Sequence, residues 1–323
     1  MASPLPTPDE LPLLGDDDRG PILLGVSWIL ASMATTFLSL RIYCKVIVTG
    51  RRLWWDDWIL IGGWFAIIAT NILTTVLVTE FRLGQHNLNL DNSSITKFLI
   101  ALNSRATVTI TAIAWTKTAF AVTLLRLTTG AAKHFVWFII VTLTIFGAVS
   151  AMVPWIQCGP LEKTWNPAVP GTCWAPGVGT NIWIATGAHS AAMDFVLAAL
   201  PWTFLWQVLL NRRERLGILV AMSMGAVAGV VAIFKCLQLP QLGSGDSYKE
   251  SALFLWDIAE SNVTLMAACI PTLRVLFRDV RKTSNTSNIP RRAGPYFVSP
   301  KRRDGDGQRP VRKEDMLPEG RIV

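Results

Sequence analysis

The chain is short of charge. Charged residues make up 16% of its 323 residues, whereas a soluble domain carries about 25%. Hydrophobic residues make up 51%, and the mean hydropathy is +0.39. The long apolar runs also lack the polar stripe at helical period that a soluble helix presents to water. This composition excludes an ordinary soluble protein and favours one embedded in a lipid bilayer.

The sequence also lacks the signatures of several functional classes. It has no zinc-ligand spacing, no glycine-rich phosphate loop and no nucleic-acid-binding motif. A net charge of +8 would suit nucleic acid, but the cations gather in the short loops of one side and in the tail beyond Leu273. That distribution is typical of an inner membrane surface, so the expected partner is the lipid bilayer and not nucleic acid. The first 21 residues have no basic start or cleavage site, so we expect the first apolar segment to direct insertion.

Seven apolar segments are long enough to cross a bilayer as helices, which takes about 20 residues. The uneven distribution of cations between the loops places the N-terminus outside and the C-terminus in the cytoplasm. We therefore predict an all-α membrane protein. A seven-transmembrane-helix bundle at 22–278 would lie between a flexible outer tail at 1–21 and a disordered basic cytoplasmic tail at 279–323. The expected helices are 22–48, 58–79, 105–127, 135–156, 181–210, 216–239 and 251–277.

A short polar loop separates the first two apolar segments. Its arginines suit the cytoplasmic side of the membrane, and its tryptophans suit the headgroup level. Its two aspartates come directly before the next apolar run, where a carboxylate accepts hydrogen bonds from the free N–H groups of a helix start. The loop therefore predicts a helix start at the membrane surface. Its sequence is Arg51-Arg52-Leu53-Trp54-Trp55-Asp56-Asp57-Trp58.

This loop and several later segments resemble the fungal rhodopsin-domain family of seven-helix integral membrane proteins, which includes receptor-like proteins of the Pth type. The later segments are Trp115-Thr116-Lys117, Cys158-Gly159-Pro160, Asp194-Phe195 and Ile270-Pro271-Thr272-Leu273-Arg274. The likeness extends from about residue 22 to residue 278. The positions that match the family pattern are Arg51, Trp55, Asp56, Asp57, Trp58, Arg126, Pro201 and Pro271.

The resemblance implies a receptor-like sensor of a small molecule, in the plasma membrane or an endomembrane. Its inner loops and basic tail would then contact a cytosolic signalling partner. Leu125-Arg126-Leu127 stands where animal receptors have an acidic residue, Arg and Tyr, which weakens any expectation of G-protein coupling. The alternative is a membrane-embedded protein or enzyme of a secondary-metabolite pathway, because some family members resemble proteins from such gene clusters.

Two covalent modifications are predicted in the outer segments. Of the five cysteines, only Cys158 and Cys173 lie in such a segment, and their spacing allows a disulfide in an oxidising compartment. We predict that this bond staples the loop and has no chemical role. Asn92-Ser93-Ser94 in the outer loop at 80–97 is a sequon for glycosylation of Asn92.

Ionisable residues inside the apolar segments give the strongest functional signal, because charges at membrane depth usually face a partner or a cavity. From the rise of a helix, Lys117 and Glu260 fall at similar height, each roughly 13–16 Å from a membrane surface. Two interpretations remain open, a structural ion pair and a ligand pocket. The pocket residues would be Lys117, Asp194, Asp257, Glu260 and His189, with Trp115 and Trp256 as walls.

No cofactor or metal is expected. Microbial rhodopsins hold retinal on a lysine in the middle of the last helix, and the segment 251–277 contains no lysine. An enzyme would need acid–base groups, for which His189 with Asp194, or Asp257 and Glu260 near Lys117, are the candidates. No nucleophile motif, metal set or cofactor fingerprint supports this alternative, so we assign no catalytic residue.

Overall fold

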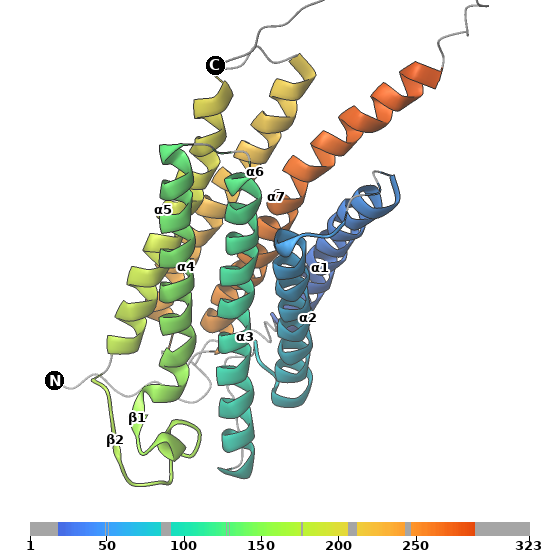
Figure 1. Ribbon diagram of the computed structural model, residues 1–323. Coiled ribbons are helices and arrows are strands. Elements are labelled where there is room, and N and C mark those ends of the chain that lie inside the picture. The colour runs from blue at the N-terminus through green and yellow to red at the C-terminus, as the bar shows by residue number, and fades with distance from the viewer. Residues whose placement is uncertain are drawn as a thin grey trace, which may run out of the picture. The chain divides into compact units, whose positions relative to one another are not determined.

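Seven long helices make up most of the described chain. The computed structural model describes residues 19–287 apart from 49, 51, 85–91, 127, 129, 176, 206–211 and 243–246. Figure 1 shows these helices as a bundle. The predicted all-helical class is confirmed. The helices are α1 (Gly20–Tyr43), α2 (Trp55–Phe81), α3 (Asn92–Leu125), α4 (Ala131–Ile156), α5 (Val178–Leu205), α6 (Arg212–Gln238) and α7 (Ser247–Ser287).

Six of the helices are long and apolar enough to cross a membrane, judged over the described residues. They are α1 together with the π-helical turn η1 (Cys44–Val48), then α2, α3, α4, α5 and α7. The apolar stretch described in α6 is shorter and covers Met222–Gln238. The predicted count of seven crossings and the predicted orientation therefore stay predictions.

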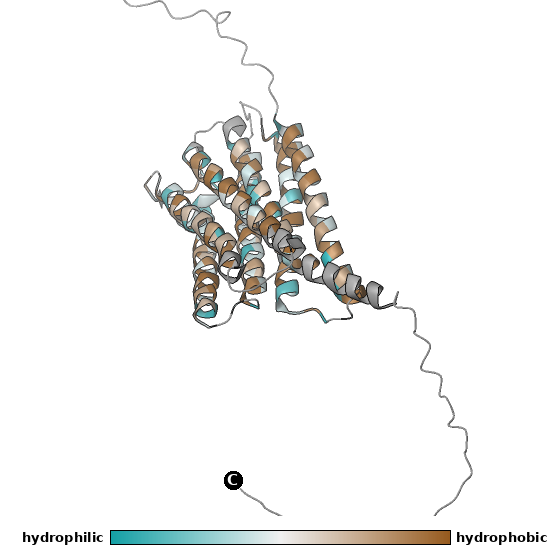
Figure 2. Ribbon diagram, turned by 90° about the horizontal axis from the view of Figure 1, so that it is seen from above, coloured by the Kyte–Doolittle hydropathy of each residue, from teal (hydrophilic) through white to brown (hydrophobic). Residues whose placement is uncertain are grey.

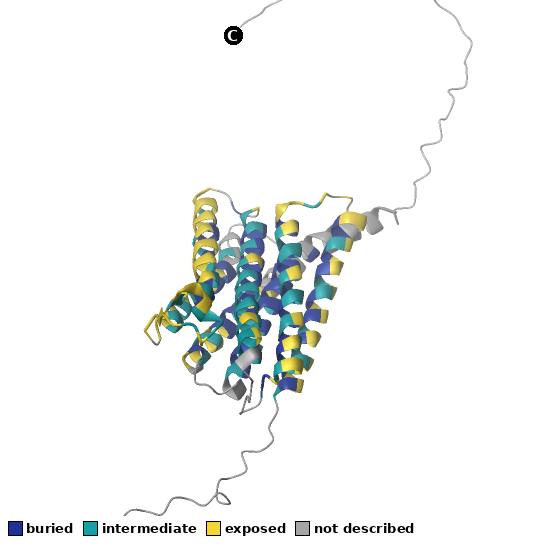
Figure 3. Ribbon diagram, turned by 90° about the horizontal axis from the view of Figure 1, so that it is seen from below, coloured by how far each residue is buried: buried dark blue, intermediate teal, exposed yellow. Residues whose placement is uncertain are grey.

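The outward surface of the bundle is apolar. In α4 the exposed side chains include Trp137, Phe138, Val141, Ile145 and Met152. Figure 2 shows that hydrophobic residues predominate along the helices, and Figure 3 shows buried residues alternating with exposed ones along most of them. A continuous apolar surface of this kind is unfavourable against water and suits lipid tails. The fold is that of a multi-pass membrane protein.

Small residues set the distance between neighbouring helices. A Cβ added at Gly147 of α4 would lie 2.9 Å from the Cβ of Ala114 on α3. One added at Gly225 of α6 would lie 3.0 Å from the Cβ of Ala198 on α5. These contacts leave no room for larger side chains, so the helices approach closely, as small residues allow in membrane bundles.

Two helices extend ten or more residues beyond their predicted ends. α3 begins at Asn92, well before residue 105, because Arg105, which interrupts the apolar run, is buried and paired inside the bundle. Asn92 is therefore the first residue of a helix, and its side chain lies outside the described residues. α7 continues to Ser287, beyond the predicted boundary at 278, since no proline or glycine interrupts 272–287. The predicted tails at 1–18 and 288–323 lie outside the described residues.

The loop between α4 and α5 carries the only strand pair of the described chain. The strands β1 (Cys158–Gly159) and β2 (Thr172–Cys173) are antiparallel, with Cys158 opposite Cys173, and the 3-10 turn η2 (Leu161–Thr164) lies between them. The two cysteines form a disulfide with their Cα atoms 4.0 Å apart. The predicted staple is confirmed.

Candidate functional site

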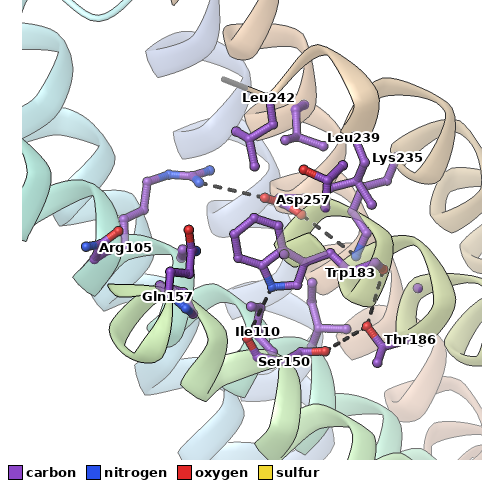
Figure 4. Close-up of a pocket in the computed structure, with 18 of the residues that line it drawn as sticks. Arg105, Ile110, Ser150, Gln157, Trp183, Thr186, Lys235, Leu239, Leu242 and Asp257 are labelled. Carbon is purple, nitrogen blue, oxygen red and sulfur yellow. Dashed lines mark hydrogen bonds and ion pairs between the residues drawn. The ribbon is translucent and has the colours of Figure 1, made fainter. Parts of the chain in front are cut away.

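A cavity of about 740 Å³ lies among α3, α4, α5, α7 and the end of α6, where the 3-10 turn η3 (Leu239–Gln241) follows. Figure 4 shows its polar side chains converging from several helices. Cys173 and Trp174, at the β2 end of the loop between α4 and α5, also line it. Most of the wall is apolar, with Phe98, Leu102, Ile110, Leu143, Phe146 and Phe254 among the lining residues, and a set of ionisable groups lies on one side.

Lys117 is the centre of the ionisable group. Its ammonium lies 2.6 Å from the hydroxyl of Ser190, 2.7 Å from a carboxylate oxygen of Asp194 and 2.6 Å from one of Glu260. The lysine comes from α3, Ser190 and Asp194 from α5, and Glu260 from α7. The structure thus brings together three of the residues named from the sequence and joins three helices through one ammonium. Lys117 lines the cavity as predicted, whereas Asp194 and Glu260 are not among the lining residues and contact it only through their pairs with Lys117.

Lys235 of α6 completes this group, although the sequence analysis did not include it. Its ammonium lies 2.5 Å from the second carboxylate oxygen of Glu260 and 3.8 Å from Asp257. Its long side chain reaches Glu260 from near the end of α6. The sequence signal for Lys235 is that it is a single lysine inside an otherwise apolar run.

Arg105 is the second residue that the sequence analysis missed. It was placed at the start of a helix, whereas α3 extends well before it and its side chain is 1% exposed. Its guanidinium lies over the ring of Phe254 at 4.0 Å, donates a hydrogen bond to the hydroxyl of Thr74 at 3.0 Å and lies 3.7 Å from Asp257. Figure 4 shows Asp257 between Arg105 and Lys235.

Two polar groups in the lining have no hydrogen-bond partner among the described residues. They are Nε2 of His189 and Nδ2 of Asn103, and both atoms are buried. The His189 ring packs edge-on against Phe146, with centroids 4.6 Å apart. His189 therefore lines the cavity but does not form the predicted pair with Asp194, which bonds Lys117. Buried polar atoms normally have partners, so these two side chains have unused hydrogen-bonding capacity beside the cavity.

The tryptophans expected as walls lie elsewhere. Trp115 packs over Gly62 of α2 and is 47% exposed, and Trp256 stacks on Phe234 of α6 with ring centroids 5.1 Å apart. Neither is among the lining residues. Trp183 of α5 is the indole that lines the cavity, and its Nε1 donates to the carbonyl of Ser150 at 3.2 Å.

The fungal rhodopsin domain matches residues 40–279, which include every helix that lines this cavity. The chain belongs to the fungal rhodopsin domain family. This chain is 24% identical over 142 residues to "Fugralins biosynthesis cluster protein 2" of Gibberella zeae, covering 43% of this chain and 34% of that protein. It is 26% identical over 123 residues to a "SAT4 family membrane protein" of Emericella nidulans, covering 38% of this chain and 30% of that one. The chain thus spans about a third of the length of these relatives, and no solved structure matches it.

The rhodopsin-domain motif at the start of α2 forms a second charged cluster, where α1 ends. Arg41 donates hydrogen bonds to Asp56 at 2.7 Å and to Asp57 at 3.1 Å, and Lys45 pairs with Asp57. Arg41 also donates to the backbone carbonyl of Ala268 on α7 at 2.5 Å. These four charged residues, Arg41, Lys45, Asp56 and Asp57, are called the α1–α2 cluster below.

Arg126 at the end of α3 joins this cluster through an ion pair with Asp56. Its guanidinium also lies over the Trp54 ring at 4.2 Å. The two aspartates lie within the first turn of α2, which begins at Trp55, and not before the helix as predicted. Asp57 accepts a hydrogen bond from the N–H of Trp54, the residue before the helix, at 3.0 Å. Trp55 and Trp58 are exposed, Arg51 lies outside the described residues, and of Pro201 only the place in α5 is described.

The chemistry of the cavity is that of binding. Its charged groups pair mainly with one another, and two neutral polar atoms remain unpartnered. Among the described residues no group of three or more His, Cys, Asp or Glu is arranged to hold a metal ion. The lining can therefore hold an organic molecule by apolar contact and a few directed hydrogen bonds.

Proposed function

We propose that this protein is a receptor-like sensor that binds a small organic molecule in the cavity between α3, α4, α5 and α7. The observation that supports this most is the cavity itself. It is large, mostly apolar, and carries two buried polar atoms without partners. A purely structural ion cluster needs no such space, because close packing around the charges would stabilise it better.

Helix α7 offers a route from the cavity to the inner end of the bundle. It carries Asp257 at the cavity, Glu260 paired with the lining residue Lys117 and, further along, the Ala268 carbonyl that Arg41 binds. Pro271 follows within the helix and removes a backbone N–H, which weakens that turn. A ligand that moves Asp257 would thus act on a helix whose far end is held by the α1–α2 cluster. We propose this coupling as the way the sensor signals.

The topology proposed with this function has seven crossings, an outer N-terminus and a cytoplasmic C-terminus. The uneven distribution of cations supports it. In this arrangement the residues at 22–278 form the sensing domain, the basic segment at 279–323 and the inner loops contact a cytosolic partner, and Asn92 is glycosylated on the outer side.

A second candidate function is a membrane-embedded component or enzyme of a secondary-metabolite pathway. The observation that favours it is the similarity to a Gibberella zeae protein whose name places that protein in a biosynthesis cluster. Under this function the same cavity would hold a pathway intermediate. Asp257, between two cations, would be the group best placed for proton transfer.

The binding proposal is tested with the full chain in lipid nanodiscs and a panel of fungal polyketides and terpenoids. A compound that binds should raise the unfolding temperature of the wild type. It should not do so in Ile110→Trp, which fills the cavity, whereas Ile145→Trp on the exposed face of α4 should respond like the wild type. Equal shifts in all three proteins would mean that the compound acts through the lipid, and the proposal would fail.

Mass spectrometry of the bound compound separates the two functions. A sensor returns the compound unchanged after long incubation, whereas an enzyme converts it. Conversion that stops in Asp257→Asn but continues in Glu162→Gln, an exposed carboxylate of the outer loop, would favour the enzyme.

A further inference from the structure

Six ionisable residues form an ion-pair network beside the cavity, and the charges of this network balance. Among the described residues, the cations contributed by α3 and α6 are matched by carboxylates of α5 and α7 through ion pairs of 2.5–3.8 Å. The cations are Arg105, Lys117 and Lys235, and the carboxylates are Asp194, Asp257 and Glu260. Glu250 also lines the cavity, but it lies about two turns from Asp257, nearer the start of α7, and has an interaction of its own.

This balance disfavours a charged ligand. An added carboxylate or ammonium would leave one buried charge without a counterpart, in surroundings where an unpaired charge is strongly unfavourable. A ligand without charge leaves every pair in place and still gains from burial against the apolar wall. The charge balance therefore selects for neutral molecules.

The cavity offers a ligand both hydrogen-bond donors and hydrogen-bond acceptors. Asp257 lies 3.7 Å from Arg105 and 3.8 Å from Lys235, which is longer than a hydrogen bond, so a hydroxyl group can bridge the carboxylate and either cation. Nδ2 of Asn103 is a donor without a partner, and Nε2 of His189 is a second unpartnered atom. A ligand must therefore both donate and accept hydrogen bonds.

We infer that the ligand of this cavity is an uncharged molecule with an apolar body and at least one hydroxyl group, which bridges Asp257 and a neighbouring cation. This inference rests on the proposed function, since it names the chemical class of the molecule bound at the same site. Neutral hydroxylated molecules of this kind also partition into a bilayer, from which a cavity among membrane helices can be filled.

The test uses three probes with one aromatic body and different head groups. They are 1-pyrenemethanol, 1-pyrenecarboxylic acid and 1-pyrenemethylamine, which at neutral pH are uncharged, negative and positive. Each is titrated into nanodiscs that hold the full chain, and bound probe is measured by fluorescence after the nanodiscs are separated. Binding to the cavity is the part that Ile110→Trp abolishes, which removes the contribution of probe dissolved in the lipid.

The wild type should bind the alcohol at least about tenfold more tightly than either charged probe. Asp257→Asn leaves one protein cation in excess, so the variant should prefer the negative probe, 1-pyrenecarboxylic acid. Arg105→Gln leaves one protein carboxylate in excess, so the variant should prefer the positive probe, 1-pyrenemethylamine. Glu162→Gln and Arg52→Gln make the same changes in charge at exposed sites and should leave the ranking unchanged.

The outcomes separate this inference from the proposed function. If a charged probe binds the wild-type cavity best, or if the ranking ignores the charge of residues 105 and 257, the inference is wrong while a ligand-binding cavity stands. If no probe shows binding that Ile110→Trp removes, the proposed function fails and the inference fails with it. The wild-type ranking decides alone where a variant does not fold.

Discussion

The ammonium of Lys117 on α3 lies 2.6 Å from a carboxylate oxygen of Glu260 on α7, and neither side chain is more than 1% exposed. The two residues do not form an isolated pair. Lys117 also bonds Asp194, and Glu260 also pairs with Lys235. Four charges from four helices therefore form one network, in which the loss of any one leaves the others unbalanced.

Lys117→Met should destabilise the protein strongly, because it leaves two buried carboxylates against one ammonium. Removing one partner of a buried pair costs about 3–5 kcal/mol. Lys117→Met with Glu260→Leu should recover only part of this, since Asp194 and Lys235 then lose their close partners. Adding Asp194→Asn and Lys235→Met removes every charge of the network and should recover more. Fluorescence-detected size-exclusion chromatography on heated samples measures the folded fraction.

Lys133→Met is the matched control for this series, because Lys133 is exposed at the start of α4. Its unfolding temperature should equal that of the wild type. A Lys117→Met variant as stable as this control would contradict the network.

Arg41→Gln should lower the unfolding temperature more than Arg126→Gln does. Arg41 is 1% exposed and bonds Asp56, Asp57 and a carbonyl of α7, whereas Arg126 is 34% exposed and its ion pair is partly in contact with solvent. Thermal unfolding of the two variants beside Arg52→Gln, an exposed arginine of the same loop, gives the comparison. Equal losses for Arg41 and Arg126 would mean that burial does not determine the strength of these contacts.

The sequence predicted the height of Lys117 and Glu260 along their helices correctly. It did not predict toward which side of its helix each neighbouring side chain points. Helical rise placed Lys117 and Glu260 at one height, and the structure brings them together. Trp115 and Trp256 are on the same helices as those residues, but they point away from the cavity. Rise along a helix follows from residue number alone, whereas rotation depends on which face packs against its neighbours.

The sequence also could not predict which charged residues of different helices pair with one another. The loop motif drew attention to Arg51 and Arg52 as cations of the membrane surface. The buried partner of Asp56 is Arg41, which lies 15 residues earlier on α1. Arg105 is the first residue of the third predicted helix, but the structure places it inside α3. Its contacts with Asp257 and Thr74 come from two other helices, which no local pattern reveals.

Replacing both Cys158 and Cys173 by serine should destabilise the loop between α4 and α5. The disulfide closes a loop with a sequence separation of 15, for which the loss is about 3 kcal/mol in the chain-entropy model. Mass spectrometry of unreduced peptides should show the two cysteines joined in the wild type, and thermal unfolding should show the loss in the variant. Alkylation of both thiols in the folded wild type would contradict the bond.

Two glycine substitutions should have opposite effects. Gly147→Ala places a Cβ 2.9 Å from Ala114 and should separate α3 from α4 and lower stability, whereas Gly25→Ala meets nothing within 4 Å. Because alanine has a higher helix propensity than glycine by about 1 kcal/mol, Gly25→Ala should be neutral or stabilising. Unfolding temperatures measured side by side check the signs, and a stabilised Gly147→Ala would show that the α3–α4 contact can yield.

The last prediction concerns whether α6 crosses the membrane, which decides the topology. Six crossings would place both ends of the bundle on one side, whereas a crossing by α6 makes seven and places them on opposite sides. With the N-terminus outside, a reporter fused after Val323 should be cytosolic. Reporters inserted at 206–211 and at 243–246, on either side of α6, should face opposite compartments. Asn92→Gln should abolish a glycosidase-sensitive shift in mobility, because the sequon is expected on the outer side.

Reporters on the same side at the two ends of α6 would reduce the bundle to six crossings. They would also expose Lys235 to one surface, which is incompatible with its place 2.5 Å from the buried Glu260.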